Sequence, residues 1–261
     1  MILADNPKLL RTPLQTISLV MGCAFMLTLL LGCSASEAPK IDAVTGLAMG
    51  TSYTVKWVVK GGVDHTVIAT GAKAELARVE ASMSTYMDAS DLRGFNGGAV
   101  GVWHQVPQAM ADLVSRSIDI SRQTGGAFDV TVGPLVDLWG FGPDPVPEHI
   151  PSDLALEALR SVIGYQHLQV QHQPAALLKT AASAIDLSAI AKGYGVDAIA
   201  SWLEAHGVMD YLVEVGGELR AHGRKPDGSV WRIAIETPAA DAGQIYQVVQ
   251  VQDMAVATSG N

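Results

Sequence analysis

Two glycine-rich segments constrain the fold of this chain more than any other feature. The first, residues 125–142, reads GGAFDVTVGPLVDLWGFG, and the second, residues 186–197, reads DLSAIAKGYGVD. Each combines glycines with carboxylates and aromatic side chains, which is too irregular a pattern for a simple core helix or strand. Glycine lets the backbone approach a ligand closely, and glycine-rich turns present N–H groups to anions. The two segments therefore predict a binding site for a planar or phosphate-bearing molecule.

The amino terminus has the features of a bacterial export signal. Lys8 and Arg11 precede an apolar run at residues 17–31, which has the length of a secretory signal and is short for a spanning helix. Cys33 follows directly after a small residue, which resembles a bacterial lipobox, so Cys33 is the predicted lipidation site. Ser34 in the next position favours the outer membrane over the inner membrane. An uncleaved anchor and a chance cysteine in an apolar run are the alternatives.

These signals divide the chain into a signal peptide at 1–32, a tether at 33–40 and one domain at 41–261. The only cysteines, Cys23 and Cys33, both precede this domain, so packing and not disulfides must hold it together. The chain carries 17 basic and 26 acidic residues, a formal net charge of −9. Without a basic cluster to offset this charge, nucleic acid is excluded as an expected partner.

Periodicity along the domain predicts an α+β fold with mostly antiparallel sheets flanked by helices. A loop is expected around the glycines of residues 94–101. Helices are predicted at residues 66–83, 107–124, 152–164 and 190–206. Strands are predicted at residues 47–60, 167–171, 177–180, 184–187, 211–215, 218–222, 230–236, 246–251 and 254–258.

One segment matches a well-known nucleotide motif. Residues 193–198, GYGVDA, fit the dinucleotide fingerprint G-x-G-x-x-A, and Glu214 follows at a distance suited to a ribose hydroxyl. The fingerprint needs its glycines directly after a strand, whereas residues 187–192 have the pattern of a helix start, so we prefer two glycines that allow close helix packing. HExxH, paired CxxC, P-loop and GxSxG motifs are absent from the sequence. Their absence disfavours zinc hydrolases, Walker-type NTPases and α/β-hydrolases, while a Ser/His/Asp triad stays open.

Seven short motifs follow one another through nearly the whole domain. They are MGT at 49–51, MSTY at 83–86, TGGAFDVTVGP at 124–134, LWGFG at 138–142, DLSAIAKGY at 186–194, EVGGE at 214–218 and ATSG at 257–260. In order and spacing they resemble the ApbE family, whose members are FAD:protein FMN transferases. The resemblance implies an ApbE-like, T-fold-like domain, and the lipobox fits the exported, membrane-tethered habit of that family.

The resemblance also implies which residues bind FAD. Met49 and Tyr86 would line the flavin pocket, Ala127, Phe128 and Asp129 would cradle part of FAD, Asp186 would hold the adenosine side and Lys192 would lie near the cofactor. A diphosphate needs cations and N–H donors, and the two ring systems need flat apolar walls. Each residue also has a structural alternative: core packing for Met49 and Tyr86, a turn for Asp129 and a solvated helix lysine for Lys192.

A magnesium ion is implied in the same way, with the carbonyl of Ala189 in its coordination shell. Members of the family continue beyond the equivalent of Asn261 into a His-Thr/Ser-Ile-Asp-Pro-x-Thr-Gly-like segment, which is implied to supply further magnesium ligands and the base. We therefore expect the catalytic residues beyond Asn261 and a domain that is incomplete at its C-terminus. The chain as written is expected to be inactive as a transferase and at best a weak FAD binder.

The reaction implied by the resemblance is transfer of FMN from FAD to a Thr or Ser hydroxyl of an acceptor protein, with Mg²⁺ and with release of AMP. The implied acceptors are exported subunits of respiratory complexes that carry a Ser/Thr flavinylation motif, and the enzyme would face the periplasm from the bacterial cell envelope. Two alternatives stay open. One is a periplasmic FAD pyrophosphatase, in which water replaces the protein hydroxyl, and the other is a non-catalytic flavin-binding lipoprotein.

Overall fold

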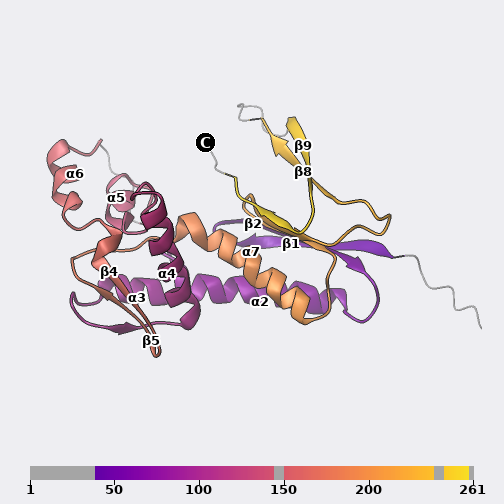
Figure 1. Ribbon diagram of the computed structural model, residues 1–261, viewed down its shortest axis with the longest axis horizontal. Helices are drawn as coiled ribbons and strands as arrows, with labels where there is room; N and C mark the ends of the chain where they lie inside the picture. The colour runs from indigo at the N-terminus through magenta and orange to yellow at the C-terminus, as the bar shows by residue number, and fades with distance from the viewer. Residues whose placement is uncertain (1–38, 144–149, 238–243, 259–261) are drawn as a thin grey trace, which may run out of the picture. The chain divides into compact units, whose positions relative to one another are not determined.

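The computed structural model describes residues 39–143, 150–237 and 244–258. The predicted signal peptide at 1–32 and the predicted lipidation site at Cys33 lie outside the described residues. The described part has the α+β architecture predicted from the sequence, with antiparallel sheets and flanking helices (Figure 1). None of its helices is long and apolar enough to cross a membrane.

The larger sheet has five strands in the order β1-β2-β6-β7-β10, and every neighbouring pair is antiparallel. Its strands are β1 (Lys40–Ala48), β2 (Thr51–Val59), β6 (Tyr211–Val215), β7 (Glu218–His222) and β10 (Met254–Val256).

Two long helices, α2 (His65–Met83) and α7 (Ser188–Ala205), pack on each other and on one face of this sheet (Figure 1). Asp64 begins α2 by accepting the Thr66 N–H at 2.7 Å, which satisfies one of the free amides of the first turn. A Cβ on Gly71 of α2 would lie 2.2 Å from the Trp202 ring, so only glycine permits the observed approach of the two helices.

The start of the sheet differs from the prediction. Instead of one strand at 47–60, the chain forms a hairpin in which Ala48 pairs with Thr51 across a two-residue turn. Met49 and Gly50 occupy this turn with φ values of 52° and 71°, the left-handed conformation that a type I′ turn requires. Strand β1 was missed because its side chains are at most half-buried, so apolar residues alternate only weakly along it.

A second, three-stranded sheet has the order β3-β5-β4 and packs with α4 (Gln108–Gln123). Its strands are β3 (His104–Gln105), β4 (Leu168–His172) and β5 (Ala175–Lys179). Helix α4 begins after Pro107, as predicted. The predicted strand at 184–187 is wrong, because Ala184 forms only an isolated parallel bridge with Val132.

Two short helices were not predicted. Helix α3 (Asp91–Gly97) lies where a loop was expected, and Ser90 caps it by accepting the Arg93 N–H at 3.1 Å. Its buried Leu92 and Phe95 belong to the second core, the apolar cluster that α3 shares with α4 and the smaller sheet and that includes Met110, Val114 and Leu177. Helix α5 (Gly133–Leu138) begins inside the first glycine-rich segment. In contrast, the helix predicted from Ser152 is present as α6 (Asp153–Arg160), followed by a single 3₁₀ turn, η1 (Tyr165–His167).

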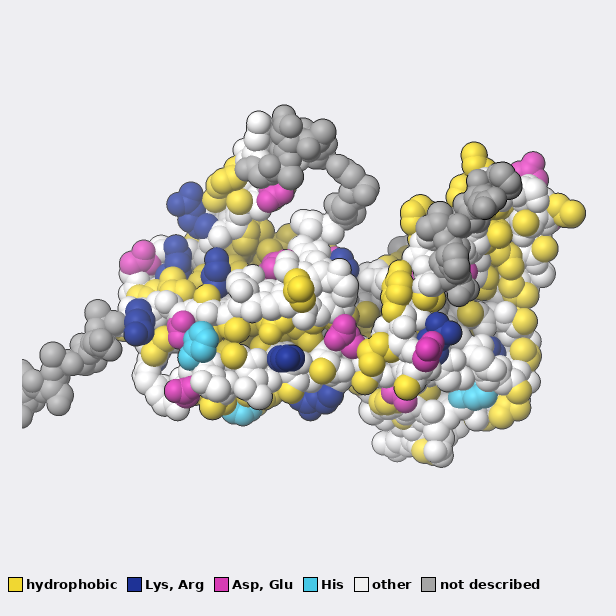
Figure 2. Space-filling view, turned by 180° about the vertical axis from the view of Figure 1, so that it is seen from behind, with side chains coloured by type: hydrophobic (Ala, Val, Ile, Leu, Met, Phe, Trp, Pro, Cys, Tyr) yellow, Lys and Arg dark blue, Asp and Glu magenta, His cyan; other side chains and the backbone are white. Residues whose placement is uncertain are grey.

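A third group of strands forms the hairpin β8 (Trp231–Glu236) and β9 (Ile245–Val251). Trp231 and Val251 at its base are buried against Val58 and Leu212 of the larger sheet. Further out the hairpin is exposed, with 61% of Ile245 and 71% of Tyr246 accessible. Apolar side chains are visible beside its undescribed tip in the space-filling view (Figure 2).

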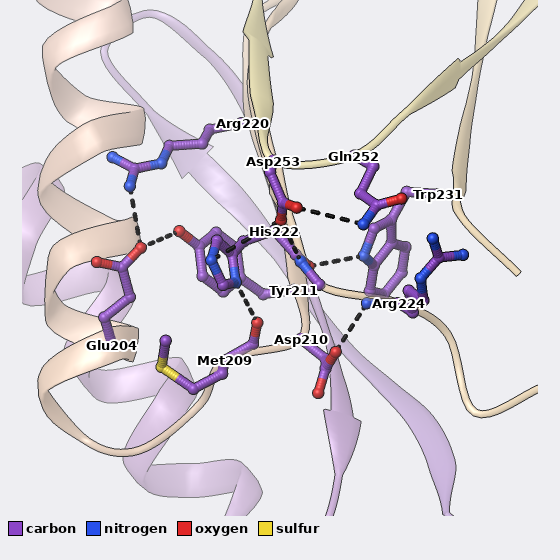
Figure 3. Close-up of polar contacts among 11 residues, drawn as sticks. Glu204, Met209, Asp210, Tyr211, Arg220, His222, Arg224, Trp231, Gln252 and Asp253 are labelled. Carbon is purple, nitrogen blue, oxygen red and sulfur yellow. Dashed lines mark hydrogen bonds and ion pairs between the residues drawn. The ribbon is translucent and has the colours of Figure 1, made fainter. Parts of the chain in front are cut away.

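A polar network joins the end of α7 to the sheet (Figure 3). The hydroxyl of Tyr211 donates to Glu204, which also accepts a hydrogen bond from Arg220 at 3.0 Å. The His222 ring stacks on Tyr211 with 5.7 Å between ring centroids, and its Nδ1 lies 2.5 Å from the carbonyl oxygen of Met209. Tyr211 itself is completely buried, so its one polar atom is satisfied inside the core.

Candidate functional site

A cavity of about 540 Å³ opens where the β1–β2 turn, the end of α2 and the start of α7 meet. Three of the predicted flavin-binding residues line it, Met49, Tyr86 and Lys192, although they lie far apart in the sequence. Three methionines are among its lining residues, Met49, Met83 and Met87. The complete lining consists of Met49, Gly50, Val79, Glu80, Met83, Ser84, Thr85, Tyr86, Met87, Ser188, Ala191 and Lys192.

Met49 lies at the cavity in a strained backbone conformation. Its φ of 52° is unusual for a residue with a Cβ, which costs about 1 kcal/mol. Its N–H donates to Glu80 Oε1 at 2.7 Å, so a carboxylate from α2 fixes the turn. A Cβ on Gly195 would lie 3.2 Å from the Met49 sulfur, so the glycine of α7 leaves room for this side chain. Local strain retained beside a cavity is typical of ligand-binding positions.

Lys192 forms an ion pair and is not the solvated helix lysine of the alternative interpretation. Its ammonium lies 2.9 Å from Glu218 Oε2 and 3.2 Å from Oε1, and 3.4 Å from the carbonyl oxygen of Gly216. The exposed fraction is 33% for the Lys192 side chain and 16% for that of Glu218. Gly216 has a φ of 55°, and a Cβ there would lie 3.2 Å from Lys192 Cδ. Two of the sequence motifs, 186–194 and 214–218, therefore meet at this lysine.

One exposed aromatic ring, that of Tyr86, lines the cavity. Tyr86 is 66% exposed and its hydroxyl donates to the carbonyl oxygen of Phe141 at 3.2 Å. Phe141 and Trp139, from the LWGFG motif, are exposed as well. Flat rings that are accessible to solvent can stack on a planar ligand, and Tyr86 is therefore not the core residue of the alternative interpretation.

Asp186 lines a second, smaller cavity of about 240 Å³, which shares Thr85 with the first. Its Oδ1 accepts the N–H of Ser188, the first residue of α7, at 2.7 Å. The guanidinium of Arg93 in the same cavity donates to the carbonyl of Thr85 at 3.1 Å. The described structure thus places the predicted adenosine-side residue next to the predicted flavin-side residues, in an adjoining cavity.

Three predicted residues line neither cavity: Ala127, Phe128 and Asp129. Asp129 has the turn role of its alternative interpretation, because its carboxylate accepts from the amide and hydroxyl of Thr131, at 2.8 and 2.6 Å, and from the amide of Tyr165 at 2.8 Å. Phe128 packs against the second core, and Ala127 is exposed. Their predicted contact with FAD stays a prediction.

The magnesium site also stays a prediction. Ala189 is exposed in the first turn of α7, beside Ser188 at the mouth of the main cavity. Mg²⁺ takes about six oxygen ligands, mostly carboxylates, phosphates and water. Among the described residues no group of three or more His, Cys, Asp or Glu side chains is placed to hold a metal ion. The described residues alone therefore do not fit a magnesium site.

Comparison with known proteins identifies the family. The model of the ApbE family matches residues 49–261. The chain belongs to the ApbE family. This result confirms the resemblance drawn from the seven motifs, which reach from the β1–β2 turn to the last residues of the chain.

Curated relatives and solved structures agree with this assignment. The chain is 39% identical over 237 residues to the FAD:protein FMN transferase of Vibrio cholerae serotype O1, covering 90% of this chain and 70% of the relative. The protein of the same name from Salmonella typhimurium is 35% identical over 250 residues, covering 92% and 71%. The solved flavin transferase ApbE from Vibrio cholerae superimposes with a TM-score of 0.80 at 39% identity, covering 85% of this chain and 72% of that one. The apo flavinyl transferase ApbE of Pseudomonas stutzeri gives 0.78 at 40% identity, covering 86% and 72%.

Sequence reasoning missed two residues of this ApbE-family site. Glu80 was not singled out within the predicted helix at 66–83, but its carboxylate accepts the Met49 N–H across 31 positions of sequence. Arg93 was not singled out either; it directly precedes the glycines where a loop was expected, whereas it belongs to α3 and lines the smaller cavity. The signal for Arg93 was Ser90 followed by Asp91 and Leu92, a capping residue followed by an acidic and then an apolar residue.

Proposed function

We propose that this chain is a flavin transferase, which moves the FMN half of FAD to a hydroxyl of an acceptor protein and releases AMP. One observation carries the proposal: a chain of the ApbE family brings Met49, Tyr86 and Lys192 from three separate elements to one cavity. Relatives that share 35–39% of its residues bear the name FAD:protein FMN transferase. The second cavity at Asp186 shares Thr85 with the first and would offer space for the AMP half of FAD.

The chemistry is phosphoryl transfer. The hydroxyl oxygen of the acceptor attacks the phosphorus on the FMN side of the diphosphate, the bond from this phosphorus to the bridging oxygen breaks, and AMP leaves with that oxygen. Catalysis of this kind depends on positioning and on neutralising phosphate charge. The described residues bind and orient FAD in this scheme, and the hydroxyl proton passes to a base outside them.

Lys192 would neutralise part of that charge. Its ammonium can exchange a Glu218 carboxylate oxygen for a diphosphate oxygen, since both are anionic acceptors. Ser188 and Ala191, in the first turn of α7, line the same cavity, where free amide groups favour anions. The isoalloxazine would stack against the accessible Tyr86 ring.

We also propose that the reaction depends on Mg²⁺, which would offset diphosphate charge that a single lysine cannot neutralise. Ala189 would contribute its carbonyl, at the mouth of the main cavity. The remaining ligands must come from FAD, from water or from residues outside the described part, because the described carboxylates do not converge there.

A mass measurement tests the transferase. The complete protein that carries this sequence is incubated with FAD, Mg²⁺ and an exported respiratory subunit bearing an Asp-x-x-Ser/Thr-Gly-Ala-Thr-like motif. We expect the acceptor to gain the mass of one FMN, and an alanine in place of its Ser or Thr to abolish the gain. FMN and AMP released without any gain would establish the pyrophosphatase instead, and FAD binding without either product would establish the flavin-binding lipoprotein.

We propose that Cys33 anchors the protein to the periplasmic side of the bacterial envelope, with the outer membrane favoured over the inner. The apolar run at 17–31 and the small residue before Cys33 support this proposal. Cells grown with an alkyne-tagged fatty acid should label the wild-type protein, and Cys33→Ala should remove the label. An unlabelled wild-type protein would overturn the anchor.

A further inference from the structure

Lys179, the last residue of β5, is a buried cation outside the two cavities. Its accessible fraction is 3%, and no carboxylate of the described residues is paired with it. Its ammonium donates to the carbonyl oxygen of Asn96 at 2.5 Å and lies 5.4 Å from the centre of the Phe95 ring. Burial lowers the pKa of Lys179, which reflects the cost of keeping a cation in this place. An apolar side chain of equal size would fill the same space without the free-energy penalty of burying a charge.

The contact joins β5 to the C-terminal end of α3. Carbonyl groups at the end of a helix lack partners within the helix, and a cation placed there satisfies them and complements the helix dipole. Asn96 is one of the last residues of α3, so Lys179 fixes the position of its backbone.

The side chain of Asn96 in turn clamps the segment that leads into α7. Its Oδ1 accepts the N–H of Ile185 at 2.8 Å, and its Nδ2 donates to the carbonyl oxygen of Ile185 at 2.9 Å. Ile185 is completely buried and directly precedes Asp186. Asp186 accepts the N–H of Ser188, the first residue of the helix on which Lys192 lies. A continuous set of contacts therefore runs from Lys179 to the wall of the site.

The segment that Asn96 holds contributes lining residues to both cavities. Asn96, Ile185 and Asp186 line the smaller cavity, and Ser188 lines the main one. A displacement of the end of α3 would move Ile185, because Asn96 holds both of its backbone polar groups. The residues that follow Ile185 would then shift at the mouth of both cavities.

We propose that Lys179 is a positioning residue for FAD binding, which acts through Asn96 on Ile185 and Asp186 and never touches the ligand. This inference rests on the proposed function, since FAD is the ligand that the two cavities would share. A lysine that served the fold alone would be replaceable by an apolar residue without effect on ligand affinity.

Lys179→Met separates these roles. Methionine has nearly the length of lysine, and its sulfur can rest on the Phe95 ring, so the fold should keep or raise its unfolding midpoint. Without the ammonium, the Asn96 carbonyl loses its partner and the backbone at this end of α3 is held less tightly, so we expect the dissociation constant for FAD to rise roughly threefold to tenfold. Lys73→Met, an exposed position on α2, is the matched control and should leave the dissociation constant unchanged.

Two further measurements test the route through Asn96. In the protein without FAD, hydrogen exchange at the Ile185 amide should become faster in Lys179→Met and stay unchanged in Lys73→Met. In an Asn96→Ala background, Lys179→Met should weaken FAD binding no further, because the residue through which it acts is already gone.

Unchanged exchange at Ile185 would overturn the inference, and so would fully additive effects of Lys179→Met and Asn96→Ala. The exchange experiment needs no ligand. A wild-type protein that fails to bind FAD would therefore refute the proposed function, while exchange at Ile185 would still decide the role of Lys179.

Discussion

The two ends of α7 use charged side chains in opposite ways. At its C-terminal end, Glu204 accepts hydrogen bonds from Arg220 of β7 at 3.0 Å and from the Tyr211 hydroxyl (Figure 3). Arg220 also pairs with Asp197, in the middle of the helix, at 3.0 Å. At its N-terminal end, Glu218 of the same strand holds the single ammonium of Lys192 beside an open cavity. The first arrangement is saturated with partners inside the fold. The second can exchange one anion for another.

The choice of cation fits this difference. Arginine presents a planar fork of donors that two carboxylates can occupy together, whereas lysine is a point charge on a flexible chain. Burial and the hydrogen bond to Glu204 together raise the pKa of Tyr211 above its ordinary value, so its hydroxyl stays protonated as a donor. We infer that the Tyr211 end of α7 stabilises the fold, whereas the Lys192 end is the one that would bind FAD under the proposed function.

The largest expected effect comes from substitutions of Tyr211, at the C-terminal end of α7. Tyr211→Ala empties a fully buried position and should lower the free energy of unfolding by about 3–5 kcal/mol, as for other large aromatic residues. Tyr211→Phe removes only the hydroxyl and should cost about 1 kcal/mol. Denaturant unfolding followed by circular dichroism measures both. Equal losses in the two variants would show that the hydrogen bond to Glu204, and not packing, dominates this end.

A smaller loss of stability is expected at the cavity end, together with a change in binding. Lys192→Met leaves the Glu218 carboxylate without its cation and should cost about 1–2 kcal/mol, less than a fully buried pair because Lys192 is one-third exposed. FAD affinity should fall. Glu218→Gln frees the ammonium for phosphate, so FAD affinity should be retained or increased. Titration with FAD checks both variants, and unchanged affinity in Lys192→Met would return that residue to a purely structural role.

The next prediction compares two glycines of α7 that differ in their surroundings. A Cβ on Gly193 meets no atom within 4 Å, whereas one on Gly195 would lie 3.1 Å from Leu76 and 3.2 Å from the Met49 sulfur. Gly193→Ala should stabilise the helix by up to about 1 kcal/mol. Gly195→Ala should stabilise it less and should weaken FAD binding, since Met49 must move. Equal gains from both substitutions in thermal unfolding would contradict the close contact at Met49.

The sequence predicted those elements whose signals are local. Strands β6 and β7 were predicted to the residue because a glycine turn separates the mostly apolar run YLVEV from the alternating segment ELRAH. Strand β1 was missed because it lies at one end of the sheet and is only partly covered. Helix α3 was missed because Gly94 and Gly97 obscured the pattern of its two buried apolar residues.

Residues of the candidate site were likewise predicted where a local motif marks them. Met49, Tyr86 and Lys192 were identified through motifs, and the fold brings all three to one cavity. Asp129 belongs to a motif as well, but its carboxylate accepts hydrogen bonds from the amides of Thr131 and Tyr165. A motif does not show such contacts within the fold. The contact of Glu80 with Met49 arises only when α2 meets the hairpin, so no local pattern could predict it.

The smallest expected effect concerns how the stability of the fold depends on pH near the Tyr211 end of α7. The group involved is Asp210, which directly precedes β6. Burial acts to raise the pKa of Asp210, but the hydrogen bonds from Lys60 and from the Arg224 amide outweigh it and hold this pKa below its ordinary value of 3.8. A carboxylate with a lowered folded-state pKa stabilises the fold above the unfolded value and loses this contribution as the pH falls through the folded value. Stability should therefore decrease below about pH 4, by less than about 1 kcal/mol for this group because Lys60 is mostly exposed.

Two variants separate the contributions of these partners. Asp210→Asn should flatten this part of the pH profile of unfolding. Lys60→Met should flatten it only in part, because the Arg224 amide still binds the carboxylate at 2.7 Å. The FAD affinity of both variants at neutral pH should match the wild type, since neither residue lines the two cavities. A pH profile of Asp210→Asn as steep as that of the wild type would move the acid sensitivity away from this end of α7, and a loss of FAD affinity would show that the two ends are coupled through the helix.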